Sequence, residues 1–279
     1  MRRIFCRGGS TGYAIALAMA MAAIASRAVA DLPAATTDPR VVLEASERLD
    51  TGNRVVARVR MTITDGGGAR RERVLASRSL RASDVTKTLI FVESPAEIRG
   101  TGLLSVDHRG ATRDDEQWLY LPSVHRATRI ASSGRSGAFL GSDFSYGDLT
   151  TVDPDDFELR MIEANAVVDG EPTWQIEATP RSAAIRDRIG YRKIDLWISK
   201  RSLLPIRSKG FLPDGRVKFI ALLDVRRVDG IETPHRLVAR TMRGSRRESE
   251  TVLERTSVRI GDASVTDADF TVPRLERGP

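Results

Sequence analysis

Residues 55–64 read VVARVRMTIT, a stretch in which two kinds of side chain alternate. From Ala57 onward, apolar residues occupy the odd positions, and arginine or threonine occupies the even ones. Successive side chains of a β-strand point to opposite faces, so this period of two predicts a strand with one buried face. Such a strand needs a sheet around it.

Similar segments follow along the chain, separated by turn residues. Gly66–Gly68 turns the first strand into a second, and Asp-Gly pairs at 169–170, 214–215 and 229–230 separate later segments. Asp-Gly between strands is a strong hairpin signal, so we expect a mainly β fold of about ten or eleven antiparallel strands. The further expected strands are KTLIFVES (87–94), TGLLSVDHR (101–109), EQWLYLP (116–122), TWQIEATP (173–180), RKIDLWIS (192–199), VKFIALLDV (217–225) and HRLVARTM (235–242).

Few helices are expected beside these strands. In RVVLEASERLD (40–50), the apolar residues recur at helical spacing, which predicts one amphipathic helix. A second, short helix is expected over 154–163, because Asp153 is a suitable cap and Pro154 suits the first helical position.

Segments 87–93 and 116–121 are apolar on both faces, so their strands need cover on two sides. We therefore expect a curved, unclosed antiparallel β-barrel with helices packed on or plugging its concave side. A sheet this long with so little helix can leave a concave apolar face for a ligand.

Residues 1–30 have the pattern of a secretory signal peptide. Arg2, Arg3 and Arg7 precede an apolar core over 14–25, and Ala28-Val29-Ala30 supplies small residues for cleavage after Ala30. The core is shorter than the about 20 apolar residues that a membrane-spanning helix needs. We expect a cleaved signal at 1–30, a linker at 31–39, one domain at 40–277 and a periplasmic location.

The composition narrows the function classes. The only cysteine is Cys6, inside the expected signal, so the mature chain would have neither disulfides nor cysteine metal sites. Cleavage of the expected signal would remove four of the 44 basic residues, so the mature chain would have 40 basic residues and 37 carboxylates. Its net charge of +3 argues against nucleic-acid binding. The histidines stand apart at 108, 125 and 235, and we expect no metal site and no cofactor.

Residues 134–149, GRSGAFLGSDFSYGDL, crowd glycine, serine and aspartate together as a catalytic or phosphate-binding loop would. Ser136 lies out of frame for a Gly-x-Ser-x-Gly elbow, and the Gly-x-x-x-x-Gly-Lys pattern of phosphate loops is missing. Asp143 and Asp148 are better explained as turn caps than as an acid and base pair. We predict that the protein is not an enzyme; a secreted hydrolase using Ser136 or Ser142 is a competing hypothesis.

The block 116–149 resembles the signature of the LolA-like outer-membrane lipoprotein-sorting family. In that signature a Trp-x-Tyr-x-Pro strand leads to a basic strand, a Ser/Gly/Arg turn and a Phe-x-Gly-Ser-Asp-Phe-Ser-Tyr-x-Asp-Leu segment. The matching positions are Trp118, Tyr120, Pro122, Arg126, Arg129, Ser132, Ser133, Arg135, Phe139, Gly141, Ser142, Asp143, Phe144, Ser145, Tyr146, Asp148 and Leu149. The hairpins after residue 195 and DADFTVPRLER (267–277) also resemble that family, so the likeness runs from about 40 to 277.

The resemblance implies a periplasmic carrier whose concave apolar face receives the acyl chains of a lipoprotein or another lipid. Members with this Ser-Asp-Phe-Ser version are similar to partners of inner-membrane exporters of the resistance-nodulation-division type, and they are not enzymes. A periplasmic sensor or regulatory binding module on the same scaffold is the alternative. We expect a monomer.

The candidate site residues come from the same block. Aromatic and apolar residues that would line or gate the cavity are Trp118, Tyr120, Phe139, Leu140, Phe144 and Tyr146. The signature loop itself contributes Arg135, Gly141, Ser142, Asp143, Ser145 and Asp148. We expect this loop to lay its apolar side on the sheet, where it would plug the cavity, gate it or meet a partner. Ordinary core packing is the competing interpretation of the aromatic residues.

Overall fold

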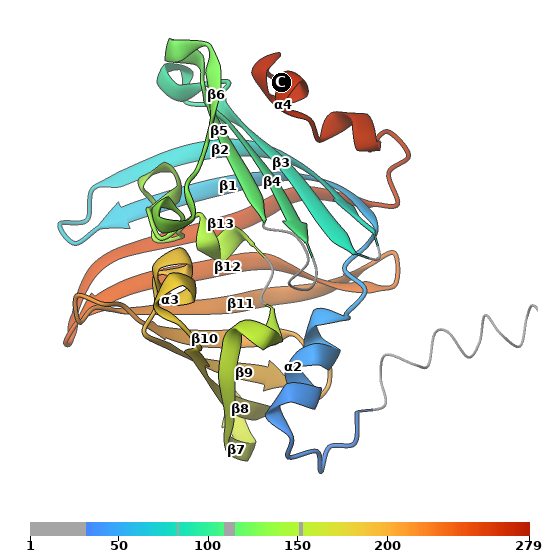
Figure 1. Cartoon of the computed structure of the whole chain (residues 1–279), viewed down its shortest axis with the longest axis vertical. Helices are drawn as coiled ribbons and strands as arrows, with labels where there is room; N and C mark the ends of the chain where they lie inside the picture. Colours follow the sequence, from blue (N-terminus) through green and yellow to red (C-terminus); the bar gives the residue numbers. More distant parts are fainter. Residues whose placement is uncertain (1–31, 83, 109–114, 151–152) are drawn as a thin grey trace, which may run out of the picture.

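The computed structural model describes residues 32–82, 84–108, 115–150 and 153–279, so the expected signal peptide lies outside the described residues. Within them, thirteen strands form one antiparallel sheet in the order β6-β5-β4-β3-β2-β1-β13-β12-β11-β10-β9-β8-β7 (Figure 1). Strands β6 and β7 are its two edges, so the sheet does not close. The predicted mainly β, unclosed architecture is confirmed, with more strands than expected.

The sheet is a meander whose two halves are joined by the pairing of β1 with β13. The strands are β1 (Arg54–Asp65), β2 (Arg70–Arg81), β3 (Val85–Ser94), β4 (Gly102–His108), β5 (Glu116–Leu121), β6 (Arg126–Arg129), β7 (Phe157–Val168), β8 (Glu171–Pro180), β9 (Lys193–Ser199), β10 (Pro205–Phe211), β11 (Val217–Val228), β12 (Ile231–Arg243) and β13 (Arg246–Ile260).

Helices are short in the described part of the chain. The α-helices are α2 (Pro39–Glu47), α3 (Ala183–Ile189) and α4 (Val272–Glu276). The 3₁₀ turns are η1 (Ala96–Ile98), η2 (Pro122–Val124), η3 (Ser132–Gly134), η4 (Phe139–Gly141), η5 (Gly147–Leu149), η6 (Pro154–Asp156) and η7 (Asp267–Asp269). None of the described helices is long and apolar enough to cross a membrane.

The turn chemistry anticipated from the sequence accounts for two of the three Asp-Gly hairpins; at 214–215 only Gly215 has positive φ. At Asp169-Gly170 and at Asp229-Gly230, both residues have positive φ, between 48° and 85°. A type I′ turn requires this conformation at both central residues, and its twist matches that of the flanking strands.

The helix expected over 154–163 is wrong. Asp153 does cap the turn, accepting a hydrogen bond from the Asp155 amide at 2.9 Å, but the turn stops at Asp156 and β7 begins at Phe157. Alternate residues Phe157, Leu159 and Met161 all face the covered side, and pairing with β8 satisfies the strand backbone. The same residues thus fit a strand once β8 lies beside them.

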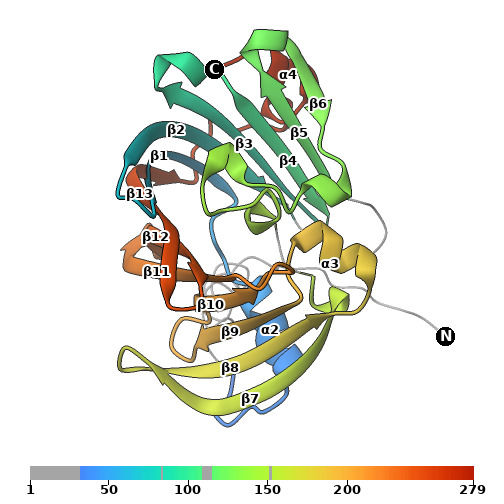
Figure 2. The ribbon, with the colours of Figure 1, turned by 90° about the vertical axis from the view of Figure 1, so that its left-hand side faces the viewer.

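Both faces of β3 are covered, as the two-faced apolar segment 87–93 predicted. Leu89 and Phe91 pack on one face against Leu275 of α4, whereas Val92 packs on the other against Phe139 of the segment between β6 and β7. Figure 2 shows the sheet as an open trough, with that segment and α3 inside its curve. At the other end of the trough, Val42 and Leu43 of α2 pack against Trp174, Ile176 and Ile198.

Candidate functional site

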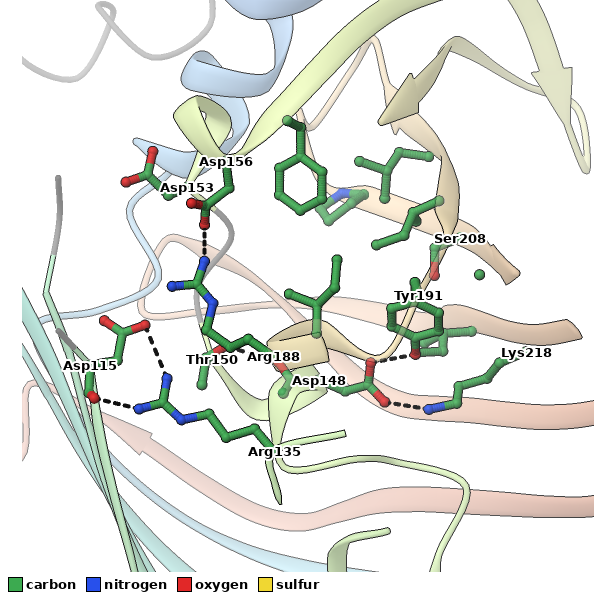
Figure 3. A pocket seen from close by; sticks show the side chains of 18 of the residues that line it. Asp115, Arg135, Asp148, Thr150, Asp153, Asp156, Arg188, Tyr191, Ser208 and Lys218 are labelled. Atoms are coloured by element: carbon green, nitrogen blue, oxygen red, sulfur yellow. Dashed lines mark hydrogen bonds and ion pairs between the residues drawn. The ribbon is translucent and has the colours of Figure 1, made fainter. Parts of the chain in front are cut away.

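A cavity of about 460 Å³ lies in the trough, between the β6–β7 segment, α3 and strands β9–β11 (Figure 3). Its floor is apolar and consists of Ile194, Leu196, Pro205, Ile220 and Leu222. Leu196 pairs with Ser208, and Ser208 pairs with Ile220, so cross-strand register places these side chains on one face. The alternation of β9 and β11 therefore places Leu196 and Ile220 on the cavity floor, with Ser208 of β10 between them.

The opposite wall of the cavity carries charged side chains that pair with one another. Arg135 lies 3.6 Å from the Asp115 carboxylate and also donates to the Asp115 carbonyl oxygen, and Arg188 pairs with Asp156 (Figure 3). Burial lowers the pKa of the Arg135 guanidinium, and burial raises the pKa of Asp156. Paired charges of this kind can face the polar end of an amphiphilic molecule whose apolar part lies on the floor.

Asp148 connects the loop to the cavity floor. Its carboxylate accepts a hydrogen bond of 2.6 Å from the Tyr191 hydroxyl. It also forms an ion pair with the Lys218 ammonium of β11, at 2.7 Å. It also accepts from the Ser145 amide at 2.8 Å, which is the turn cap expected from the sequence. Burial, together with Asp148, raises the pKa of Tyr191 well above its usual range. Replacing one partner of such a buried ion pair lowers the free energy of unfolding by about 3–5 kcal/mol.

Asp143 fastens the middle of the loop to the sheet. Its carboxylate accepts hydrogen bonds from Thr241 at 2.5 Å, from Thr251 at 2.7 Å and from Ser249. Its amide donates to the Thr251 hydroxyl at 2.9 Å. The side chain therefore fixes the loop across β12 and β13 on the concave face.

The loop also closes on itself. The Phe139 amide donates to the Phe144 carbonyl at 2.7 Å, and the Gly147 amide donates to the Arg135 carbonyl at 2.8 Å. The Ser142 hydroxyl donates to the Phe139 carbonyl at 2.7 Å. Gly141, which follows Leu140, has a φ near 66°, and glycine adopts this conformation without strain. Residues 135–149 are consequently a compact plug rather than an extended strap.

The candidate aromatic residues divide between the two faces of the sheet. Phe139 and Tyr146 meet edge to face, 5.8 Å between ring centroids, and pack with Leu140 on the concave face. Trp118 and Tyr120 lie on the other face, in the cluster that contains Leu275 of α4. Phe144 is buried in the plug, with 3% of its surface exposed. The structure therefore does not gather these residues at one site.

The cavity lining differs from the sequence-predicted set. Of the site residues predicted from the sequence, Arg135 and Asp148 line this cavity as the described residues form it. None of the aromatic candidates lines it. The residues missed are the floor of β9–β11, together with Arg188, Tyr191 and Lys218. Alternation in RKIDLWIS and VKFIALLDV signalled a two-sided strand, but it does not say which side faces a cavity. Within the described part of the chain, no three His, Cys, Asp or Glu side chains lie close enough to hold a metal ion.

Comparison with known proteins places this fold. No curated protein sequence matches the chain. Among solved structures, a domain described as outer membrane lipoprotein-sorting from Vibrio parahaemolyticus is 23% identical, with a TM-score of 0.76 over 86% of this chain and 98% of its own. A DUF1329 family protein from Desulfovibrio piger is 26% identical, with a TM-score of 0.75 over 86% and 100%. A LolA superfamily protein from Nitrosomonas europaea is 20% identical, with a TM-score of 0.63 over 85% and 98%.

The sequence itself matches a family model whose description reads "Uncharacterized protein", over residues 84–277. This match covers β3 to α4, including the plug and every strand of the cavity floor. The chain therefore belongs to this family, and its fold is the one that the three solved structures share.

Proposed function

We propose that the protein is a periplasmic carrier that holds the acyl chains of a lipoprotein or another lipid in the trough and passes them towards the outer membrane. The observation that carries this proposal is a cavity with an apolar floor on β9–β11 and a charged wall formed by the plug and α3. The description of the Vibrio relative as a lipoprotein-sorting domain supports the same assignment. An inner-membrane exporter of the resistance-nodulation-division type is the proposed source of the cargo.

The energetics suit an acyl chain. Transferring each methylene from water to an apolar surface contributes about 0.8 kcal/mol, so a long chain is held without any specific polar contact. The cavity of about 460 Å³ lies within the usual range for ligand pockets, which is roughly 300–1,000 Å³. The paired charges at the wall keep a polar end group in contact with polar atoms.

Displacement of the plug would make room for a larger cargo. Phe139 packs on Met61, Ile63, Leu75, Val92 and Leu103, so it covers the apolar concave face of β1–β4. Movement of the plug would join this covered face to the cavity floor. We propose that the plug gates the trough, with Phe139 and Tyr146 taking the place that acyl chains occupy in the loaded protein.

Adjacent leucines of β11 allow a matched test. Leu222 lines the cavity, whereas its neighbour Leu223 points to the other face and is 38% exposed. Leu222→Gln places an amide on the floor and is expected to weaken lipid binding about tenfold, which corresponds to about 1.4 kcal/mol. Leu223→Gln has the same chemical change and is expected to bind like the unmodified protein.

The measurement is native mass spectrometry of protein purified from the periplasm, followed by titration with a fluorescent fatty acid. We expect co-purified lipid in the unmodified protein and in Leu223→Gln, and reduced lipid in Leu222→Gln. A protein that is empty and does not bind the fatty acid would refute the carrier function, as would equal losses in the two variants.

A further inference from the structure

A row of apolar side chains crosses the concave face from the cavity floor to the plug. Register aligns Leu222 of β11 with Leu237 of β12, and Leu237 with Leu253 of β13. Leu253 in turn aligns with Met61 of β1, and both pack in the cluster that contains Phe139 of the plug. Neighbouring strands lie about 4.8 Å apart, so the row is about 14 Å long. We call these four aligned side chains the apolar row.

Arg255 of β13 lies beside the apolar row. It aligns with Val59 in the same register in which Leu253 aligns with Met61, and Val59 packs in the concave cluster. Side chains two residues apart on a strand share a face and are separated by about 7 Å. The Arg255 side chain therefore leaves β13 on the concave face, next to Leu253.

The guanidinium of Arg255 has unused donors. Its Nη1 group donates to the Pro234 carbonyl oxygen of β12, and the side chain is partly buried. Among the described residues it forms no ion pair, and its Nε and Nη2 groups have no hydrogen-bond partner. Neither of these two nitrogens is fully enclosed by protein. Both can therefore donate to an acceptor that the fold does not supply.

Arginines on the opposite face of the same strands are paired. Arg58 of β1 lies 2.6 Å from the Glu93 carboxylate, and Arg259 of β13 lies 2.9 Å from that of Asp262. Burial lowers the pKa of the Arg255 guanidinium, which shows that its charge is partly desolvated. Desolvating a charge is costly unless an opposite charge compensates for it. An anion brought by a ligand would supply that compensation.

The chemistry on the two sides of Arg255 indicates the kind of ligand. A guanidinium presents its N–H donors in a planar fork that matches two oxygens of a carboxylate or a phosphate. The apolar row suits a hydrocarbon chain, because each methylene that leaves water contributes about 0.8 kcal/mol. An amphiphile with an anionic end satisfies both surfaces at once.

We propose that Arg255 binds the anionic group of the cargo, a carboxylate or a phosphate at the end of an acyl chain that lies along the apolar row. This inference rests on the proposed carriage of acyl chains and adds the charge of the cargo. The cations of the cavity wall already have carboxylate partners; these cations are Arg135, Arg188 and Lys218. The paired wall is thus left to uncharged polar atoms of the cargo.

Three ligands with similar hydrocarbon chains test the anion site: palmitate, hexadecyl phosphate and neutral monopalmitoylglycerol. Each is titrated against delipidated protein that holds a neutral naphthylamine dye, and displacement of the dye gives the affinity. We expect the two anions to bind about tenfold more tightly than the neutral lipid, as a charge-assisted hydrogen bond allows. In Arg255→Met the anions are expected to bind as weakly as the neutral lipid, whose own affinity stays unchanged.

Arg236→Met is the matched control. Arg236 is exposed on the neighbouring strand β12 and aligns with Leu223, which points away from the cavity. This variant loses the same charge from the other face, so it should keep the preference for the anions. Circular dichroism melts check that each variant folds, and Arg255→Gln, with the same expected loss of preference, is used if Arg255→Met does not fold.

The outcomes separate the anion site from the carrier function. A protein that binds none of the three ligands would refute carriage itself, whereas equal binding of all three would overturn the anion site alone. An equal loss of the three ligands in Arg255→Met would also overturn it, because Arg255 would then support the fold and not the anion. So would binding of inorganic phosphate at Arg255 without any preference among the lipids, since the site would then serve a free anion.

Discussion

Asp107 gives the sharpest quantitative prediction about this protein. The residue lies on β4, is 2% exposed and accepts a hydrogen bond of 3.1 Å from the Ser105 hydroxyl. Burial raises its pKa from 3.8 to about 7, and the charge of Asp115 adds to the effect, while Ser105 and Arg135 oppose it. The folded protein therefore holds a proton on Asp107 at a pH where the unfolded chain has released it.

The sign and size of the effect follow from proton linkage. Between pH 3.8 and about 7 the native state binds more protons than the unfolded state, so the free energy of unfolding falls as the pH rises. A shift of about three units corresponds to about 4 kcal/mol at pH 8, since each unit is worth about 1.4 kcal/mol. Below pH 3.8 both states are protonated and Asp107 has no effect.

Asp107→Asn removes the ionisation and keeps the shape and an acceptor for Ser105. We expect the variant to be more stable than the unmodified protein at pH 8, by up to about 4 kcal/mol, and equally stable near pH 4. Urea unfolding measured from pH 4 to 8.5 checks this, and Asp169→Asn, at a carboxylate that is 73% exposed, should follow the unmodified protein. A loss of stability at pH 8 in Asp107→Asn would refute the reasoning, since it would mean that an ionised Asp107 is held by Arg135.

Two substitutions test the packing on opposite faces of the sheet. At Gly102 an added Cβ would lie 2.6 Å from Leu275 and 2.7 Å from Phe91, so Gly102→Ala should lower the melting temperature and expose α4 to limited proteolysis; unchanged cleavage would contradict this packing. Phe144→Ala, at a side chain that is 3% exposed, should cost about 3–5 kcal/mol of unfolding free energy in urea melts. An unaltered midpoint would show that the plug is not packed as described.

The sequence predicted the sheet from features that act over a few residues. The alternation of VVARVRMTIT and the Asp-Gly turns are local, because side-chain direction and turn conformation depend on adjacent dihedral angles. The two-faced strand 87–93 also predicted cover on both sides, and the plug and α4 provide it. Over 154–163 the local signals were insufficient, since a capped acidic turn fits the start of a helix and equally a turn before a strand.

The cavity required the tertiary structure. Trp118 and Tyr120 belong to the same sequence block as Phe139 and Tyr146. In the folded protein, however, Trp118 and Tyr120 lie on the face of the sheet that α4 covers, whereas Phe139 and Tyr146 pack on the concave face. Asp148 caps Ser145 as its neighbours suggested, whereas its partners Tyr191 and Lys218 lie 43 and 70 residues away.

By itself, the sequence determined an antiparallel β protein with a glycine-rich crossing loop. Only the tertiary structure decided which face of each strand is concave, which carboxylates fasten the plug and which residues form the floor. The physical reason is that period and turn type are set within a few residues, whereas a cavity exists only where curvature brings distant strands, a loop and a helix around the same space.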